Sequence, residues 1–154
     1  MKKKINPLLF AIALALFFLV AYSFKQIKKE KKIIFSEKAP KPIGPYSQAI
    51  MVGNTLFVSG MVGINDKGVL DTSDIKTETK LALNNILEIL KAAGMNENQV
   101  VKATVYLKDI RNFAAMNEVY GSVFTKDPPA RETVEIKNLP KGARIEISVV
   151  AVGM

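Results

Sequence analysis

The sequence predicts an α+β domain of the order ββαβαββ, preceded by one apolar helix at the N-terminus. Three observations lead to this prediction. Residues 7–24 carry no charge. Beyond residue 40, short apolar runs bounded by Gly, Pro and Asn predict five strands. Between them, two segments repeat apolar residues every three or four positions, as helices that pack one side against a sheet do.

The apolar N-terminal segment is flanked by lysines on both sides. Lys2, Lys3 and Lys4 precede it and five further lysines follow between residues 25 and 32. Eighteen helical residues would extend about 27 Å, enough to cross a bilayer's hydrocarbon core. The sequence therefore predicts a membrane anchor spanning residues 7–24, within an N-terminal region of residues 1–34. A signal peptide cleaved near Ser23, and hence a secreted domain, is the alternative. The lysine excess after the segment favours a cytoplasmic domain.

Charge separates this region from the rest of the chain. Residues 1–34 hold eight Lys and one Glu, which gives +7, whereas residues 35–154 hold fourteen basic and thirteen acidic residues, which gives +1. A nearly neutral domain lacks the electrostatic footprint of nucleic-acid binding. The chain has neither His nor Cys. This excludes His-based triads, thiol nucleophiles, disulfides and zinc sites, and no metal site is expected.

Local signals delimit each element of the domain. Residues 25–40 form a polar tether, and Gly53-Asn54 joins strands 48–52 and 55–62 as a hairpin. Gly60 predicts a bulge or a close approach inside the second strand. The remaining elements are a helix over 75–93, capped near Asp74 and ended by Gly94, a strand over 100–107, a helix over 112–124 capped by Asn112, and two strands near 131–136 and 143–152.

Two helices can cover only one face of such a sheet. The other face also carries apolar residues, Val150 and Val152 among them. An uncovered apolar face predicts a closed homo-oligomer, with a pocket at the boundary between subunits.

Two charged residues in the last two strands are the candidates for chemistry. Arg131 stands at the start of one strand, and Glu146 lies inside the apolar run of the next strand in sequence. An arginine can hold a carboxylate bidentately. A glutamate among Ile, Val and Ala either has an ion-pair or hydrogen-bond partner or takes part in a functional site. On neighbouring strands the two would form a small anion-binding pocket that handles water. Alternatively, Arg131 pairs with a nearby glutamate and Glu146 faces solvent.

Six segments together resemble the RidA/YjgF family of enamine/imine deaminases, in the family's order over residues 35–154. They are Ile43-Gly44-Pro45-Tyr46-Ser47-Gln48-Ala49, Phe57-Val58-Ser59-Gly60, residues 101–109, residues 113–120, Pro129-Ala130-Arg131 and residues 139–147.

The resemblance implies a trimer similar to trimeric chorismate mutase, with three clefts between subunits. It implies hydrolysis of reactive 2-iminoacids, which arise from enamines, to 2-ketoacids and ammonia without a cofactor. By position, Arg131 would hold the substrate carboxylate and Glu146 would orient water. Tyr46, Ser59, Gly60 and Asn117 match positions that line or support the cleft, and Thr133 is expected to contact the substrate through its backbone or its hydroxyl.

Three features depart from the family pattern: Thr133 stands where many members have Cys, Met61 where many have Gln, and the membrane segment is added. A non-catalytic module that binds a small ligand, or a membrane-tethered scaffold, therefore remains the alternative function.

Overall fold

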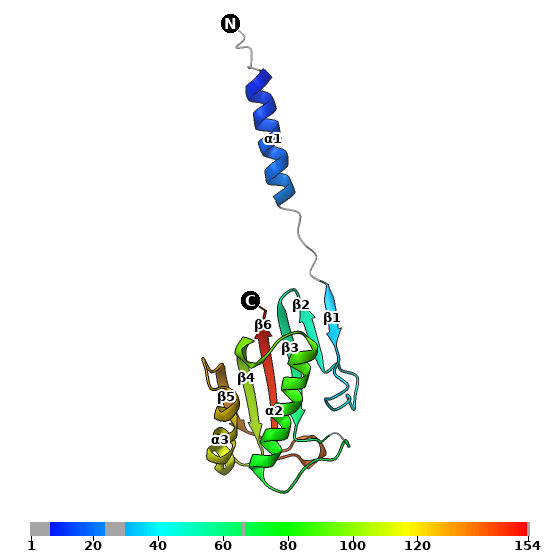
Figure 1. Ribbon diagram of the computed structural model, residues 1–154, viewed down its shortest axis with the longest axis vertical. Helices are drawn as coiled ribbons and strands as arrows, with labels where there is room; N and C mark the ends of the chain where they lie inside the picture. Colours follow the sequence, from blue (N-terminus) through cyan, green and yellow to red (C-terminus); the bar gives the residue numbers. More distant parts are fainter. Residues whose placement is uncertain (1–6, 24–29, 66, 154) are drawn as a thin grey trace.

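The computed structural model describes residues 7–23, 30–65 and 67–153. Within this part of the chain, strands and helices alternate as the sequence predicts, with one strand added at the start (Figure 1). The helices are α1 (Pro7–Ser23), α2 (Ile75–Ala92) and α3 (Phe113–Val123); the strands are β1 (Lys31–Ile34), β2 (Ala49–Val52), β3 (Thr55–Val62), β4 (Val100–Leu107), β5 (Ala130–Glu135) and β6 (Ile145–Val152).

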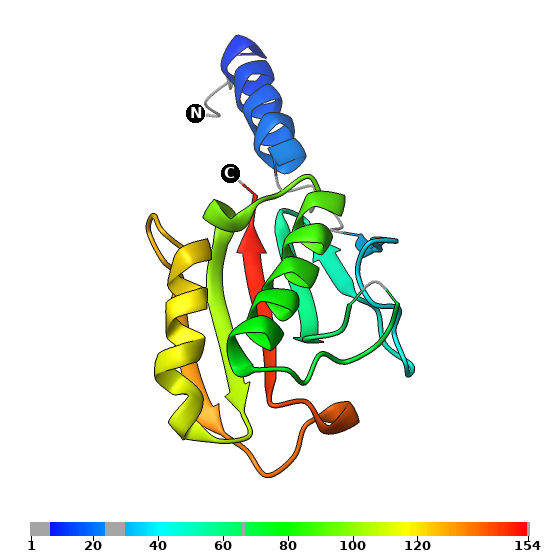
Figure 2. The same ribbon diagram turned by 60° about the horizontal axis from the view of Figure 1, so that its bottom comes forward.

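All six strands form one sheet in the order β1-β2-β3-β6-β4-β5. Every neighbouring pair is antiparallel except β4 and β5, which are parallel. The parallel pair requires a crossover, and α3 provides it. Both α2 and α3 lie on one face of the sheet (Figure 2), which confirms the predicted layer arrangement.

The core lies between this face and the two helices. Along β6 the buried residues Ile145, Ile147, Val149 and Ala151 alternate with half-buried ones, because successive side chains of a strand point to opposite faces. Leu83, Ile86 and Leu90 of α2 are buried opposite them. The residues in between, Glu146 included, therefore point to the face that no helix covers.

Most predicted local signals are confirmed. The β2–β3 hairpin turns at Gly53, whose φ of 63° only glycine adopts readily. The register of β3 against β6 shifts between Val58 and Met61, so a bulge lies at Gly60. The side chain of Asp74 accepts hydrogen bonds from the N–H groups of Lys76 and Thr77 at the start of α2. Asn112, however, makes no side-chain capping bond to α3.

The polar tether predicted over residues 25–40 is wrong in its second half. Lys31–Ile34 is a strand that pairs with β2, and Ile34 is buried in the core. The segment after β1 is also fixed, because the buried Gln48 amide accepts from the N–H of Ser36 and donates to the carbonyl oxygens of Ser36, Ala39 and Pro40. The folded unit thus begins before the predicted boundary at residue 35.

The apolar N-terminal segment forms α1, which has 17 residues and lies apart from the sheet (Figure 1). Among the described residues, no helix combines the length and the apolar character that crossing a membrane requires. This finding does not support the predicted membrane-spanning anchor over residues 7–24. The flanking lysines at positions 2–4, 25, 28 and 29 lie outside the described residues.

Candidate functional site

The sequence-predicted site residues divide into two groups at different places in the fold. Tyr46, Ser59, Gly60 and Glu146 line a cavity of about 410 Å³, here named the glutamate cavity. Asn117, Arg131 and Thr133 lie on α3 and β5, at the edge of the sheet, and are named the arginine edge together with Tyr120. None of the arginine-edge residues lines the glutamate cavity.

Strand order and strand face keep the two groups apart. β4 lies between β5 and β6, so the strands of Arg131 and Glu146 are separated by two strand spacings, about 10 Å. Arg131 contacts α3 and so lies on the helix-covered face, whereas Glu146 points to the uncovered face. The prediction that neighbouring strands bring both residues into one pocket is therefore wrong for a single chain.

Glu146 occupies a position that the backbone of β3 leaves open. A Cβ on Gly60 would lie 2.6 Å from the Glu146 Cδ, closer than real Cβ contacts come. The missing side chain thus lets the carboxylate rest against β3 at the bulge. Burial raises the pKa of the Glu146 carboxyl above its ordinary value of 4.5. Among the described residues, no side chain or backbone group hydrogen-bonds this carboxylate, so its oxygens are available to a ligand or to water.

Loops held in place by the β2–β3 hairpin form the other walls of the glutamate cavity. The Ser59 hydroxyl donates a hydrogen bond to the carbonyl oxygen of Ser47 at 2.7 Å and so ties the preceding loop to β3. Tyr46 is 49% exposed. Its hydroxyl accepts a hydrogen bond from the N–H of Ile43. Met61 also contributes to the cavity lining, but it pairs with Ile147 and is 4% exposed, so its side chain belongs to the core on the helix-covered face and not to the face of Glu146.

At the arginine edge, α3 fixes the Arg131 guanidinium. Its Nη2 donates to Asn117 Oδ1 at 2.7 Å, and its Cζ lies 4.4 Å from the centre of the Tyr120 ring. Stacking on an aromatic ring and one hydrogen bond hold the planar group while other N–H donors stay available. Arg131 makes no ion pair among the described residues, so the alternative in which it pairs with a nearby glutamate is not what the structure contains.

Two buried hydroxyl groups accompany Arg131. The Tyr120 hydroxyl and the Thr133 Oγ1 have no hydrogen-bond partner among the described residues. Burial raises the pKa of the Tyr120 hydroxyl, and the Arg131 cation opposes this effect. Buried polar atoms without a partner are uncommon in folded proteins, and these two hydroxyls are available to a ligand or to water. Sequence reasoning did not select Tyr120, although its place one turn beyond Asn117 puts both on the same side of a helix.

A second buried glutamate, which the sequence reasoning also missed, braces the start of β6. The side chain of Glu78, on α2, is fully buried. It accepts from the N–H of Arg144 at 2.7 Å and from its Nε at 2.8 Å. Gly63 makes room for it, since a Cβ there would lie 2.6 Å from the Glu78 carbonyl oxygen. Glu78 could have been found from the apolar stripe of α2, because it falls on the same face as Ile75 and Ala82.

Comparison with known proteins identifies the family. The family model described as Endoribonuclease L-PSP matches residues 36–153. The chain belongs to this family. The match confirms the resemblance to RidA/YjgF proteins that the six sequence segments carry.

Several relatives are similar to this chain over most of their length. A RutC family protein of Pyrococcus horikoshii is 53% identical over 122 residues, which cover 79% of this chain and 97% of the relative. The human protein named 2-iminobutanoate/2-iminopropanoate deaminase is 46% identical over 123 residues, covering 79% of this chain and 90% of the relative. The crystal structure of the YjgF gene product of Escherichia coli superposes with a TM-score of 0.77 at 38% identity, covering 80% of this chain and 99% of that one.

Proposed function

We propose that this protein hydrolyses reactive 2-iminoacids to 2-ketoacids and ammonia. The observation that carries the proposal is the Glu146 carboxylate, which is half-buried, has a raised pKa, and faces a cavity without a hydrogen-bond partner among the described residues. A group of this kind can hold a water molecule and take up its proton. The deaminase name of relatives 46–48% identical supports the same chemistry.

The reaction needs little activation beyond positioning. The imine carbon is already electrophilic, so a water oxygen oriented by Glu146 forms a bond to it while the proton of the water passes to the carboxylate. The electron pair of the C=N double bond moves onto the nitrogen, which takes the proton from the Glu146 carboxyl and becomes an amino group on the tetrahedral carbon. The hydroxyl proton of that carbon then passes to the same nitrogen through the Glu146 carboxylate, the C–N bond breaks, ammonia leaves, and the C=O bond of the 2-ketoacid forms. Positioning of the two reactants supplies much of the rate enhancement in such a step.

We assign to Arg131 the role of binding the substrate carboxylate. Its guanidinium is held by Asn117 and Tyr120 with donors to spare, and a planar fork suits a carboxylate. The buried Thr133 and Tyr120 hydroxyls lie at the same edge as further donors. Thr133 therefore supplies a hydroxyl where many family members have a thiol.

Because one chain keeps Arg131 and Glu146 on opposite faces, the proposed site is completed by a second copy. In the trimer that the family resemblance implies, the arginine edge of one subunit would face the glutamate cavity of the next. The uncovered face supports association, since Ile33, Ile50, Phe57 and Val150 lie opposite one another across β1, β2, β3 and β6. Such an apolar row exposed on a sheet marks an interaction surface.

The test is hydrolysis of an iminoacid generated in situ by an amino-acid oxidase. We expect the full chain to speed release of the ketoacid. Arg131→Ala is expected to raise KM and lower kcat/KM at least a hundredfold through loss of the bidentate contact. Glu146→Gln is expected to lower kcat more than it changes KM. A parent protein that binds 2-ketoacids without turning over any iminoacid would instead support the non-catalytic binding module.

A membrane-tethered scaffold is the second candidate, and one observation favours it. Six large apolar side chains of α1 are 48–68% exposed: Leu8, Phe10, Ile12, Leu14, Leu16 and Phe17. Flotation with lipid vesicles, comparing the full chain with a chain that begins at Glu30, tests whether these side chains attach the protein to lipid. If both chains stay with the soluble fraction, this candidate fails.

A further inference from the structure

The glutamate cavity continues into a second cavity that is rich in lysine. The second cavity has a volume of about 380 Å³ and shares Pro40, Lys41, Ile43, Ile64 and Lys141 with the first. Lys38 and Lys67 line its far part. The two cavities therefore form one groove that starts at Glu146, runs past apolar walls and past Lys41 and Lys141, and continues to Lys38 and Lys67.

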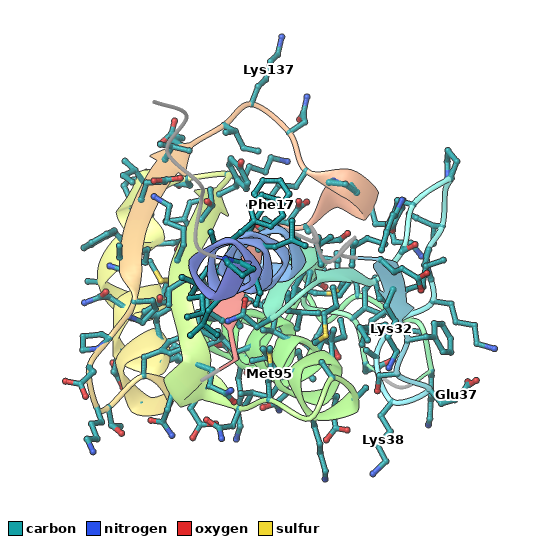
Figure 3. All side chains as sticks on the ribbon, turned by 90° about the horizontal axis from the view of Figure 1, so that it is seen from above. Phe17, Lys32, Glu37, Lys38, Met95 and Lys137 are labelled. Atoms are coloured by element: carbon teal, nitrogen blue, oxygen red, sulfur yellow. The ribbon has the colours of Figure 1, made fainter. Side chains whose placement is uncertain are left out.

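The four ammonium groups have no ion-pair partner in the part of the chain that the structure describes. The four salt bridges found there involve Lys76, Lys102, Arg111 and Arg144. The one described acidic residue lining the second cavity, Glu37, also makes no ion pair, and both it and Lys38 extend outward from the segment after β1 (Figure 3). The groove thus presents an excess of uncompensated positive charge to a ligand.

The backbone holds two of these lysines in fixed places. Lys41 follows Pro40, whose carbonyl oxygen accepts a hydrogen bond of 2.9 Å from the buried Gln48 side chain. Lys141 has a φ of 57°, a left-handed conformation that a residue with a Cβ seldom adopts. The turn around it is closed by hydrogen bonds from Gly142 N to Leu139 O and from Ala143 N to Pro140 O. Strained residues of this kind cluster at ligand-binding sites.

From this groove we infer the substrate class: 2-iminoacids whose side chain ends in a second carboxylate, held by Lys41 and Lys141. This inference rests on the proposed function. The iminoacid group lies at Glu146, the aliphatic stem of the side chain packs against Pro40, Ile43 and Ile64, and the terminal carboxylate reaches the ammonium groups. An ammonium on a flexible stem adapts to a carboxylate at several depths, so acidic side chains of different length are accepted.

The test compares two substrates with side chains of similar length, the iminoacids formed from L-glutamate and L-norleucine. For the full chain, kcat/KM is measured for each, and their ratio gives the preference for the acidic side chain. In the double variant Lys41→Gln, Lys141→Gln we expect this ratio to fall roughly fivefold or more, because two partly exposed charge interactions are lost. Lys80→Gln, on the exposed side of α2, is the matched control and should leave the ratio unchanged.

A ratio in the double variant within twofold of the parent's would overturn the inference. A binding measurement separates it from the proposed function. If no iminoacid is turned over, calorimetric titration with 2-oxoglutarate and 2-oxohexanoate decides instead. The inference is supported if the parent binds 2-oxoglutarate more tightly than 2-oxohexanoate and the double variant loses this difference. Equal affinity of parent and double variant for 2-oxoglutarate overturns it.

Discussion

At the scale of single residues, Gly60 determines whether the Glu146 carboxylate can rest against β3. A methyl group at Gly60 would overlap that carboxylate, while the backbone of Gly60 is not left-handed and would accept alanine. We expect Gly60→Ala to displace Glu146 and to lower kcat for iminoacid hydrolysis at least tenfold, since small displacements of a catalytic group are costly. Steady-state kinetics with a folding check by circular dichroism measures this.

The control for Gly60→Ala is a glycine with space around it. Around Gly121, in α3, no atom other than its chain neighbours and the backbone of its own helix lies within 4 Å of the place where a Cβ would stand. Gly121→Ala should keep full activity and add roughly 0.5–1 kcal/mol of stability, as alanine does in helices. Full activity of Gly60→Ala would contradict the role given to Glu146.

The raised pKa of Glu146 has a consequence for stability. At low pH the carboxyl is protonated in both states and contributes nothing. As the pH rises through 4.5, the unfolded chain loses this proton first, while the folded chain keeps it up to the raised pKa, so stability falls over that window and stays lower above it. The side-chain amide introduced by Glu146→Gln does not ionise. The variant should therefore melt at a higher temperature than the parent at about pH 7, with the difference vanishing near pH 4.

The same titration governs activity. Water activation needs the ionised carboxylate, so kcat of the parent should decline as the pH falls through a value above 4.5. A calorimetric scan in which Glu146→Gln melts below the parent at neutral pH would show that the carboxylate stabilises the fold, contrary to this account.

The residue types of the site followed from the sequence, but their relative placement did not. An arginine and a strand glutamate pointed to carboxylate binding and water handling, and both lie in suitable surroundings. Because side chains alternate along β6, Glu146 does point to the other face of the sheet from Ile145 and Ile147. Whether Arg131 shares its face depends on the order of strands in the sheet and on the register of β5 with β4, and both are set by long-range pairing that no local pattern encodes.

At the scale of elements, one ion pair joins α2 to the start of β6. Glu78→Ala would leave the Arg144 guanidinium, whose Nη2 is already buried without a partner, without its ion-pair partner among the described residues. We expect a loss of about 3–5 kcal/mol in the free energy of unfolding. Urea denaturation at a fixed protein concentration measures it. Glu118→Ala removes the exposed Lys76–Glu118 pair and should cost less than about 1 kcal/mol.

β1 was missed because its sequence, Lys31-Lys32-Ile33-Ile34, is short and half charged. Such a segment becomes a strand only because β2 offers it an unpaired edge, and lysines are common on edge strands. A chain that begins at Phe35 should thus be less stable by roughly 2 kcal/mol, since it loses the buried Ile34 side chain. A chain that begins at Glu30 should match the full protein in thermal melting. Equal melting of all three would show that β1 adds nothing.

At the scale of the whole molecule, opposite placement of Arg131 and Glu146 makes a prediction about mixed assemblies. Arg131→Ala and Glu146→Gln are each expected to be inactive alone. If every site takes Arg131 from one copy and Glu146 from the next, a trimer that contains both variants has some sites with neither substitution. Random mixing in equal amounts leaves roughly a quarter of the sites intact, because each site draws one residue from each of two copies.

The measurement is iminoacid hydrolysis by the two variants after joint unfolding and refolding, with each variant refolded alone as the control. Recovery of roughly a quarter of the parent's kcat per chain is expected for sites shared between copies. Sites confined to one chain give no recovery, because every chain then carries a defect. Sedimentation of the same samples shows whether assembly has occurred. An inactive but assembled mixture would therefore mean that Arg131 of one copy and Glu146 of another do not share a site.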